Sequence, residues 1–204
     1  VYSVVSAAGS LGTVSPDGAR LVFVEVGPQS SVIGGYDLGL QARFQLAVEN
    51  GPISSATWSP AGNRIAYLRH DVGMTTLKVR NLSGAATTNA VASAGEIDSP
   101  AWLSDSVHLV FAAVLQTATS TTRKAYVVSA IAPPAGLTSA LGLPADPSIT
   151  VDNPVPSPDG HQIAFLSGNQ VWLMNADGTR PTPLTTFDSA SFPYSCRTPA
   201  WTRA

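Results

Sequence analysis

The sequence predicts an all-β protein, a β-propeller built from four-stranded blades of about 44 residues. Three observations predict it: a recurring segment, a tight-turn motif opening each copy, and strands that are apolar on both faces. Four segments align without a gap, beginning at Ser15, Ser59, Leu103 and Ser157, so their starts lie 44, 44 and 54 residues apart. A period of 40–45 residues matches one four-stranded propeller blade.

The turn motif is Ser-Pro-Asp-Gly, as at Ser15–Gly18. Proline presets φ, aspartate accepts local backbone hydrogen bonds and glycine takes a positive φ, so a three-residue hairpin with a bulge is expected. The third copy, Leu103–Ser106, departs most because it lacks the proline and the glycine.

The strand after each turn alternates two sets of apolar residues. One face carries an aliphatic and an aromatic residue in each copy: Leu21/Phe23, Ile65/Tyr67, Leu109/Phe111 and Ile163/Phe165. The opposite face carries Val22, Ala66, Val110 and Ala164. Because both faces are apolar, each small sheet needs cover on both sides, which adjacent blades supply.

Later strands are predicted in each repeat, at 77–80, 125–128, 171–174 and 182–186. In the first repeat, the stretch from Ile33 to Leu40 is expected to be broken by Gly34 and Gly35. The extra residues of the third repeat are expected in polar or Pro/Gly-rich loops, at 116–123 and 132–148. Trp58, Trp102 and Trp201 recur at blade period and are expected to pack between blades, each indole N–H bonded to a backbone partner.

With these residues in view, the chain resembles the WD40-like repeats of TolB-type β-propellers. The resemblance rests on the fourth repeat, Ser157–Phe165 with Val171–Gly178, and on the second, and it covers about residues 9–204. It implies that the segment ending in tryptophan is the innermost strand and that six blades are typical. Propellers of this kind serve as scaffolds, sensors and accessory domains of enzymes.

Residues 1–204 are interpreted as one domain with repeats at about 9–52, 53–96, 97–150 and 151–194 and an extra strand at 195–204. Residues 1–5 are a candidate outer strand beside it. Four repeats do not make six blades, which leaves three options: a trimmed fragment, which we favour, an irregular small ring, or an open array completed by another copy. The first residue is Val1, as expected of a processed or trimmed chain. An open blade edge favours self-association into a homo-oligomer.

The composition disfavours several classes of binding partner and protein. Charged residues make up 12% of the chain and the net charge is −2, so nothing favours binding of nucleic acid or an anionic membrane. No apolar run reaches 18 residues, so no transmembrane segment is expected. Cys196 is the only cysteine, which rules out an intrachain disulfide.

Catalytic, dinucleotide and metal-binding motifs are not found in the sequence, so no enzyme activity, cofactor or metal is predicted. His108 and His161 fall at repeat positions typical of the surface. His70 is expected in a loop where it can pair with Asp71, an arrangement that is usually structural.

One repeat column suggests binding. Four residues before each tryptophan position stand Ser10, Ser54, Asp98, Asp152 and Arg197. If this segment is the inner strand, these side chains gather at one mouth of the central channel, where the resemblance implies that ligands and partner peptides bind. Two carboxylates beside one arginine can bind a cationic or polar group, or satisfy one another in an ion pair.

The leading prediction is a non-enzymatic scaffold: a protein-binding propeller of a bacterial TolB-like envelope protein, periplasmic or extracellular. A GC-rich bacterial source is inferred from abundant alanine and nine arginines to two lysines. The alternatives are the accessory propeller of an enzyme, of the serine peptidase or polysaccharide lyase type, and a propeller fragment that self-assembles.

Overall fold

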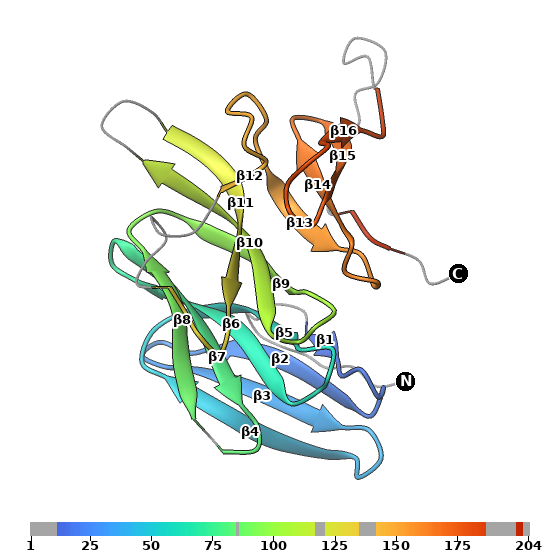
Figure 1. Ribbon diagram of the computed structural model, residues 1–204. Helices are drawn as coiled ribbons and strands as arrows, with labels where there is room; N and C mark the ends of the chain where they lie inside the picture. The colour runs from blue at the N-terminus through green and yellow to red at the C-terminus, as the bar shows by residue number, and fades with distance from the viewer. Residues whose placement is uncertain (1–11, 85, 117–120, 135–141, 187–198, 202–204) are drawn as a thin grey trace.

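The computed structural model describes residues 12–84, 86–116, 121–134, 142–186 and 199–201. Within them the chain forms four antiparallel sheets of four strands each and no helix (Figure 1). The first two sheets comprise β1 (Thr13–Val14), β2 (Arg20–Val26), β3 (Ser31–Asp37), β4 (Ala42–Glu49), and β5 (Ile53–Trp58), β6 (Arg64–Asp71), β7 (Met74–Asn81), β8 (Thr87–Ser93). The last two comprise β9 (Ile97–Trp102), β10 (His108–Gln116), β11 (Thr121–Ser129), β12 (Gly142–Leu143), and β13 (Asp152–Pro156), β14 (Gln162–Ser167), β15 (Gln170–Asn175), β16 (Thr182–Pro183).

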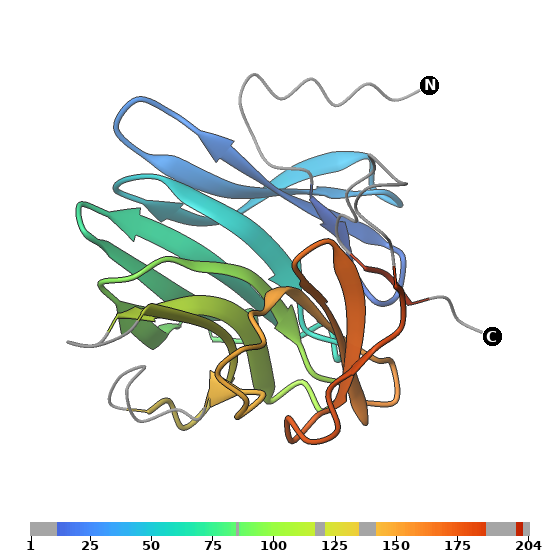
Figure 2. The same ribbon diagram turned by 90° about the horizontal axis from the view of Figure 1, so that it is seen from above.

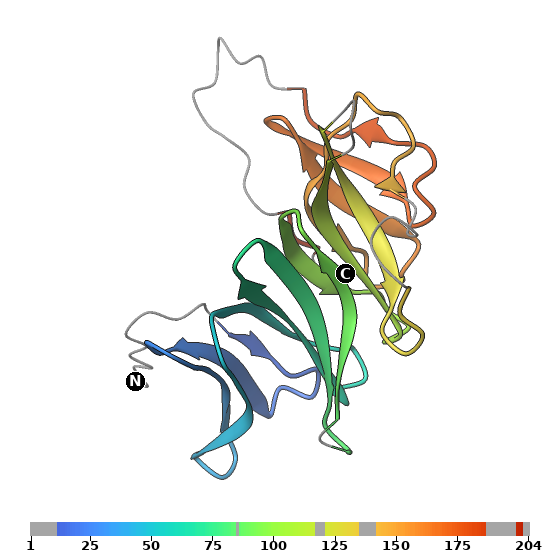
Figure 3. The ribbon, with the colours of Figure 1, turned by 90° about the vertical axis from the view of Figure 1, so that its left-hand side faces the viewer.

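Each sheet is a meander whose strands pair in chain order. The first strands of successive sheets contact one another, β1 with β5, β5 with β9 and β9 with β13, so they form the inner side of the stack. Seen from above, the sheets fan out from that side (Figure 2), and they follow one another along an arc with the first and fourth sheets at its ends (Figure 3). These are the predicted propeller blades.

The tight turn forms in all four repeats, including the irregular third. Gly18, Gly62 and Gly160 adopt φ of 71°, 69° and 77°, and Ser106 takes the same place at 58°. Its N–H donates to the Leu103 carbonyl (3.1 Å), as the glycines donate to their serines. The Ser106 hydroxyl also accepts the N–H of Ala61 in the turn of the second repeat (2.8 Å), a contact that glycine has no side chain to make.

The predicted break at Gly34 and Gly35 is wrong for the strand itself, because β3 runs through both residues, although its pairing with β4 shifts register between Ile33 and Gly34. An aromatic ring covers each glycine. A Cβ on Gly34 would lie 2.8 Å from the Phe23 ring, and one on Gly35 would lie 2.2 Å from the Phe44 ring. Glycine therefore makes room for packing here and does not end the strand.

The third repeat also departs from expectation. The predicted loop at 116–123 begins and ends in strand, since β10 ends at Gln116 and β11 begins at Thr121; residues 117–120 lie outside the described residues. In the second predicted loop, Gly142 and Leu143 form β12. Residues 1–5 lie outside the described residues, and so does most of the predicted strand at 195–204; residues 199–201 are described but are not assigned as strand.

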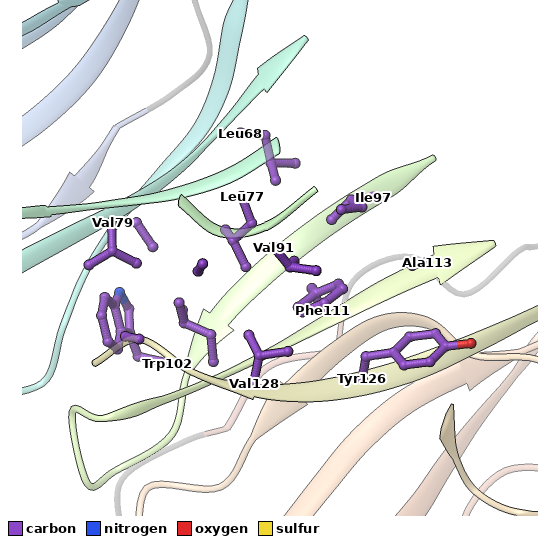
Figure 4. Packing of buried hydrophobic residues seen from close by; sticks show 14 residues of the cluster. Leu68, Leu77, Val79, Val91, Ile97, Trp102, Phe111, Ala113, Tyr126 and Val128 are labelled. Atoms are coloured by element: carbon purple, nitrogen blue, oxygen red, sulfur yellow. The ribbon is translucent and has the colours of Figure 1, made fainter. Parts of the chain in front are cut away.

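The core consists of layers between neighbouring sheets, as strands apolar on both faces require. Tyr67 and Ile65 face the first sheet, and Ala66 on the same strand faces the third. Figure 4 shows the layer between the second and third sheets, where Leu77 and Val91 meet Phe111 and Trp102. Phe111 and Tyr126 stack with ring centroids 6.1 Å apart.

The tryptophans join the blades in the predicted way. The indole N–H of Trp58 donates to the Thr13 carbonyl and that of Trp102 to the Thr57 carbonyl, both at 3.2 Å. Trp201 makes the same bond to the Val155 carbonyl at 3.0 Å. Each indole thus clamps the inner strand of the preceding repeat, and Trp201 occupies the position that a fifth repeat would supply.

Candidate functional site

Three of the five predicted site residues lie at the beginnings of inner strands. Ser54 and Asp98 are the second residues of β5 and β9, and Asp152 is the first residue of β13. Since the inner strands contact one another in order, these positions gather at one end of the stack, opposite the tight turns. Ser10 and Arg197 lie outside the described residues.

A β-bulge follows each of the three positions. Ser55, Ser99 and Asn153 have φ of 57°, 50° and 47°, values that non-glycine residues adopt at a cost. The pairing register shifts at each of these places. The Ser99 hydroxyl donates to the Asn153 side-chain oxygen (2.6 Å) and so joins the third blade to the fourth.

Sequence reasoning missed Arg123, which lies near the start of β11. Its guanidinium donates through one terminal nitrogen to Asp98 and through Nε to Asp152. The other terminal nitrogen lies 3.6 Å from the Glu96 carboxylate. The main chain adds a further link, since the Arg123 carbonyl accepts the N–H of Val151 (3.1 Å). The arginine between the two predicted carboxylates is therefore Arg123 in the described part of the chain.

The sequence does hold a signal for Arg123. In a meander, the third strand starts at the same end of the sheet as the first, so a residue early in β11 lies near the start of β9. With residues 116–123 predicted as a loop, the position of Arg123 relative to the start of β9 is not predicted.

The electrostatics of the cluster favour the charged arginine. Burial opposes the charge, but hydrogen bonds and attraction from Asp98 and Asp152 raise the pKa of Arg123 above its ordinary value. Three carboxylates surround one guanidinium, which leaves the cluster negative. Oδ1 of Asp98 is buried and has no hydrogen-bond partner among the described residues, so it is a spare acceptor.

Ser54 belongs to a separate pair. Its hydroxyl lies 2.8 Å from Nε2 of His70, whose Nδ1 faces the Thr75 hydroxyl at 3.5 Å. The predicted pairing of His70 with Asp71 is wrong, since His70 is part of β6 and Asp71 bonds to Arg69 instead. A serine–histidine pair without an orienting carboxylate is not a catalytic triad.

The described residues hold no group of three or more His, Cys, Asp or Glu side chains placed to bind a metal ion. They also include no helix long and apolar enough to cross a membrane. The two histidines predicted at the surface are there: His161 is exposed, and Nδ1 of His108 lies 2.6 Å from the Asp105 carboxylate, with 43% and 44% of these two side chains exposed.

No family model matches this chain, and no curated protein matches it. Solved structures do. TolB from Acinetobacter baumannii superimposes with a TM-score of 0.69 at 17% identity, over 87% of this chain and 43% of that one. A puromycin-hydrolysing peptidase from Mycobacterium tuberculosis gives 0.66 at 16% identity, over 87% of this chain and 31% of that one.

An oligogalacturonate lyase solved with manganese gives a TM-score of 0.65 at 14% identity, over 85% of this chain and 52% of that one. The chain thus spans 43% of the TolB structure, 31% of the peptidase and 52% of the lyase. Identities this low show the fold alone. By its blades, its turns and these neighbours, the chain has the fold of a TolB-like β-propeller.

Proposed function

We propose that this chain is a non-enzymatic scaffold, a protein-binding propeller of a bacterial cell envelope, and that it binds its partner at the ends of the inner strands. The observation that carries the proposal is the cluster of Glu96, Asp98 and Asp152 around Arg123, at the end where the inner strands begin. Its place outside the cytoplasm rests on the likeness to TolB.

The cluster has two roles in this proposal. Arg123 fastens the third blade to the fourth, which is the structural role expected of an ion-pair network. The remaining negative charge, which reaches the surface at Glu96, suits a cationic or hydrogen-bond-donating group of the partner. Glu96 is the member best placed to meet a partner, because 70% of its side chain is exposed.

Two variants separate these roles. Glu96→Gln removes an exposed charge with a single long contact to Arg123, so the unfolding temperature stays unchanged while partner binding weakens. Asp98→Asn removes the charge of a carboxylate that pairs closely with Arg123, so both quantities fall. The measurements are thermal unfolding and retention of envelope proteins on the immobilised chain, compared between wild type and each variant.

Asp177→Asn is the matched control, since it removes an exposed charge in the hairpin after β15, at the end of the stack that carries the tight turns. Retention of one protein that is weakened by Glu96→Gln and not by Asp177→Asn supports the proposal. Loss of stability in Asp98→Asn and Asp152→Asn with intact retention contradicts it and leaves a purely structural cluster.

A second candidate is the accessory propeller of an enzyme. Its support is the superposition with a peptidase and a lyase of which this chain covers 31% and 52%. The sequence of the full-length gene product discriminates the two, because this role requires a catalytic domain in the same protein.

Self-assembly is the third candidate. Its support is the first sheet, where the apolar side chains of Val14, Val26 and Val48 are exposed. A mass in solution of 21.0 kDa contradicts this candidate, and a multiple of that mass supports it.

A further inference from the structure

A groove of about 430 Å³ lies between the first and second blades, at the end that carries the tight turns. Its walls are apolar and come from both blades: Leu40, Phe44 and Leu46 from the first, and Trp58 and Leu82 from the second. Leu40 stands at its edge with 79% of its surface exposed. A smaller hollow of about 170 Å³ adjoins it, and the two share Arg20 and Trp58.

The carboxylate of this groove already accepts several hydrogen bonds, whereas one of its guanidinium groups still has N–H donors that a ligand can use. Asp37 accepts the N–H groups of Gly39 and Leu40 through Oδ1 and Nε–H of Arg20 through Oδ2. These contacts, with the backbone bond from Leu40 first among them, hold the pKa of Asp37 below its ordinary value, so its carboxylate stays charged and occupied. Arg43 pairs with Glu25 and lies over the Phe23 ring, 5.4 Å from its centroid.

Since Arg43 is paired with Glu25, Arg20 is the cation of this groove that can bind an anionic group of a ligand. Among the described residues its guanidinium donates one hydrogen bond, through Nε to Asp37; it lies 6.0 Å from the Phe44 ring centroid, and half of the side chain is exposed. A guanidinium can pair with a carboxylate through two parallel hydrogen bonds, and its terminal nitrogens are available for that.

We propose that this groove binds the C-terminal end of a partner protein whose last residue is apolar. The side chain of that residue packs between Phe44 and Leu82, and its terminal carboxylate pairs with Arg20. The groove is small, near the lower limit of small-ligand pockets, and this size suits a chain end better than a long segment. The site is separate from the inner-strand ends, so it stands or falls independently of the proposed function.

The test uses two peptides that differ only at the end, acetyl-Ala-Leu-Phe with a free carboxylate and the same peptide as its amide. Each is titrated into the isotope-labelled chain while backbone amide and indole N–H signals are followed by NMR. The free acid is expected to shift the signals of residues 40–46 and the Trp58 indole, and to bind about fivefold more tightly than the amide.

Arg20→Gln is expected to abolish the preference for the free acid and leave the weaker apolar binding in place. Arg64→Gln is the matched control: Arg64 also opens the second strand of its blade, but its guanidinium donates to the Ser106 carbonyl (2.9 Å) and does not line the groove. This control keeps the full preference. Leu82→Ser weakens both peptides equally.

Several results overturn the proposal: equal binding of acid and amide, no shift in the groove up to about 10 mM peptide, or loss of the preference in Arg64→Gln. Equally tight binding of an internal acidic peptide, acetyl-Phe-Glu-amide, overturns the claim for a chain end. Stronger shifts with neutral phospholipid vesicles than with the free acid overturn it in favour of a membrane surface.

Discussion

The junction between the third and fourth blades is built differently from the two junctions before it. Trp58 and Trp102 clamp the inner strand of the preceding blade, whereas Pro156 stands at that position in the fourth blade and has no N–H to donate. Polar contacts take the place of the clamp, from Ser99 to Asn153 and from Arg123 to Asp152. Neighbouring blades can therefore be joined through an indole or through an ion pair. The junction joined by the ion pair is also the candidate binding site.

The largest expected effect tests the indole clamp. Trp102 is almost fully buried between the second and third blades, so Trp102→Ala is expected to lower the free energy of unfolding by about 3–5 kcal/mol through lost burial and a cavity. Denaturant unfolding measures this. Trp102→Phe keeps most of the apolar surface and isolates the indole hydrogen bond, at a cost of about 1–2 kcal/mol. A loss under 1 kcal/mol for Trp102→Ala shows that the clamp does not hold this junction.

Glu49 adds a polar network to the first junction. Its carboxylate accepts the hydroxyl of Tyr67 (2.5 Å) and the ammonium of Lys78 (2.7 Å), both from the second blade. Burial disfavours the charge, but these bonds and the charges of Lys78 and Arg69 lower the pKa of Glu49 below its ordinary value of 4.5. Glu49→Gln is expected to cost about 2–3 kcal/mol near pH 7, measured by denaturant unfolding.

The pH dependence has a definite sign. A carboxyl whose pKa is lower in the folded state binds fewer protons there, so its contribution to stability is complete above pH 4.5 and is lost as the pH falls through the folded pKa. The stability difference between wild type and Glu49→Gln is therefore expected to shrink below pH 4.5. A difference that stays constant down to pH 3 contradicts the assignment.

The polar junction is expected to be weaker than either indole junction. Arg123→Gln removes a cation whose side chain is 21% exposed, at an expected cost of about 1–2 kcal/mol. In 1 M salt this loss of stability should be smaller, because salt screens the exposed charges of the network. A double-mutant cycle with Asp98→Asn measures the coupling directly, and additive losses show that the two residues do not act as a pair.

The smallest effect concerns the third turn. Ser106→Ala keeps the strained φ of 58° and removes the acceptor for the Ala61 N–H, so it is expected to cost about 1 kcal/mol. Ser106→Gly removes the same acceptor but relieves the backbone, so it should be more stable than the alanine variant by about 1 kcal/mol. Thermal unfolding compares the two, and equal stabilities show that the turn carries no backbone strain.

The repeats in the sequence predict most of the fold but only part of the candidate site. The turn motif and the alternation at Leu109–Phe111 depend on local residue chemistry, so the blades and their covered faces were predictable. The break at Gly34–Gly35 was predicted wrongly because the rings that fill the space come from Phe23 and Phe44, on neighbouring strands. Arg123 was missed because residues 116–123 have a composition typical of loops, although β10 and β11 pair as far as Gln116 and Thr121.

Short residue patterns repeated along the chain predict the four blades, their period, the tight turns and the tryptophans between them, because each of these features depends on a local motif. The packing of the folded chain establishes which arginine lies between Asp98 and Asp152, which hydroxyl meets His70, and that a groove opens beside Arg20. These are contacts between residues from 16 to 29 positions apart or from different blades, and they depend on strand register and blade packing, which the repeat pattern does not encode.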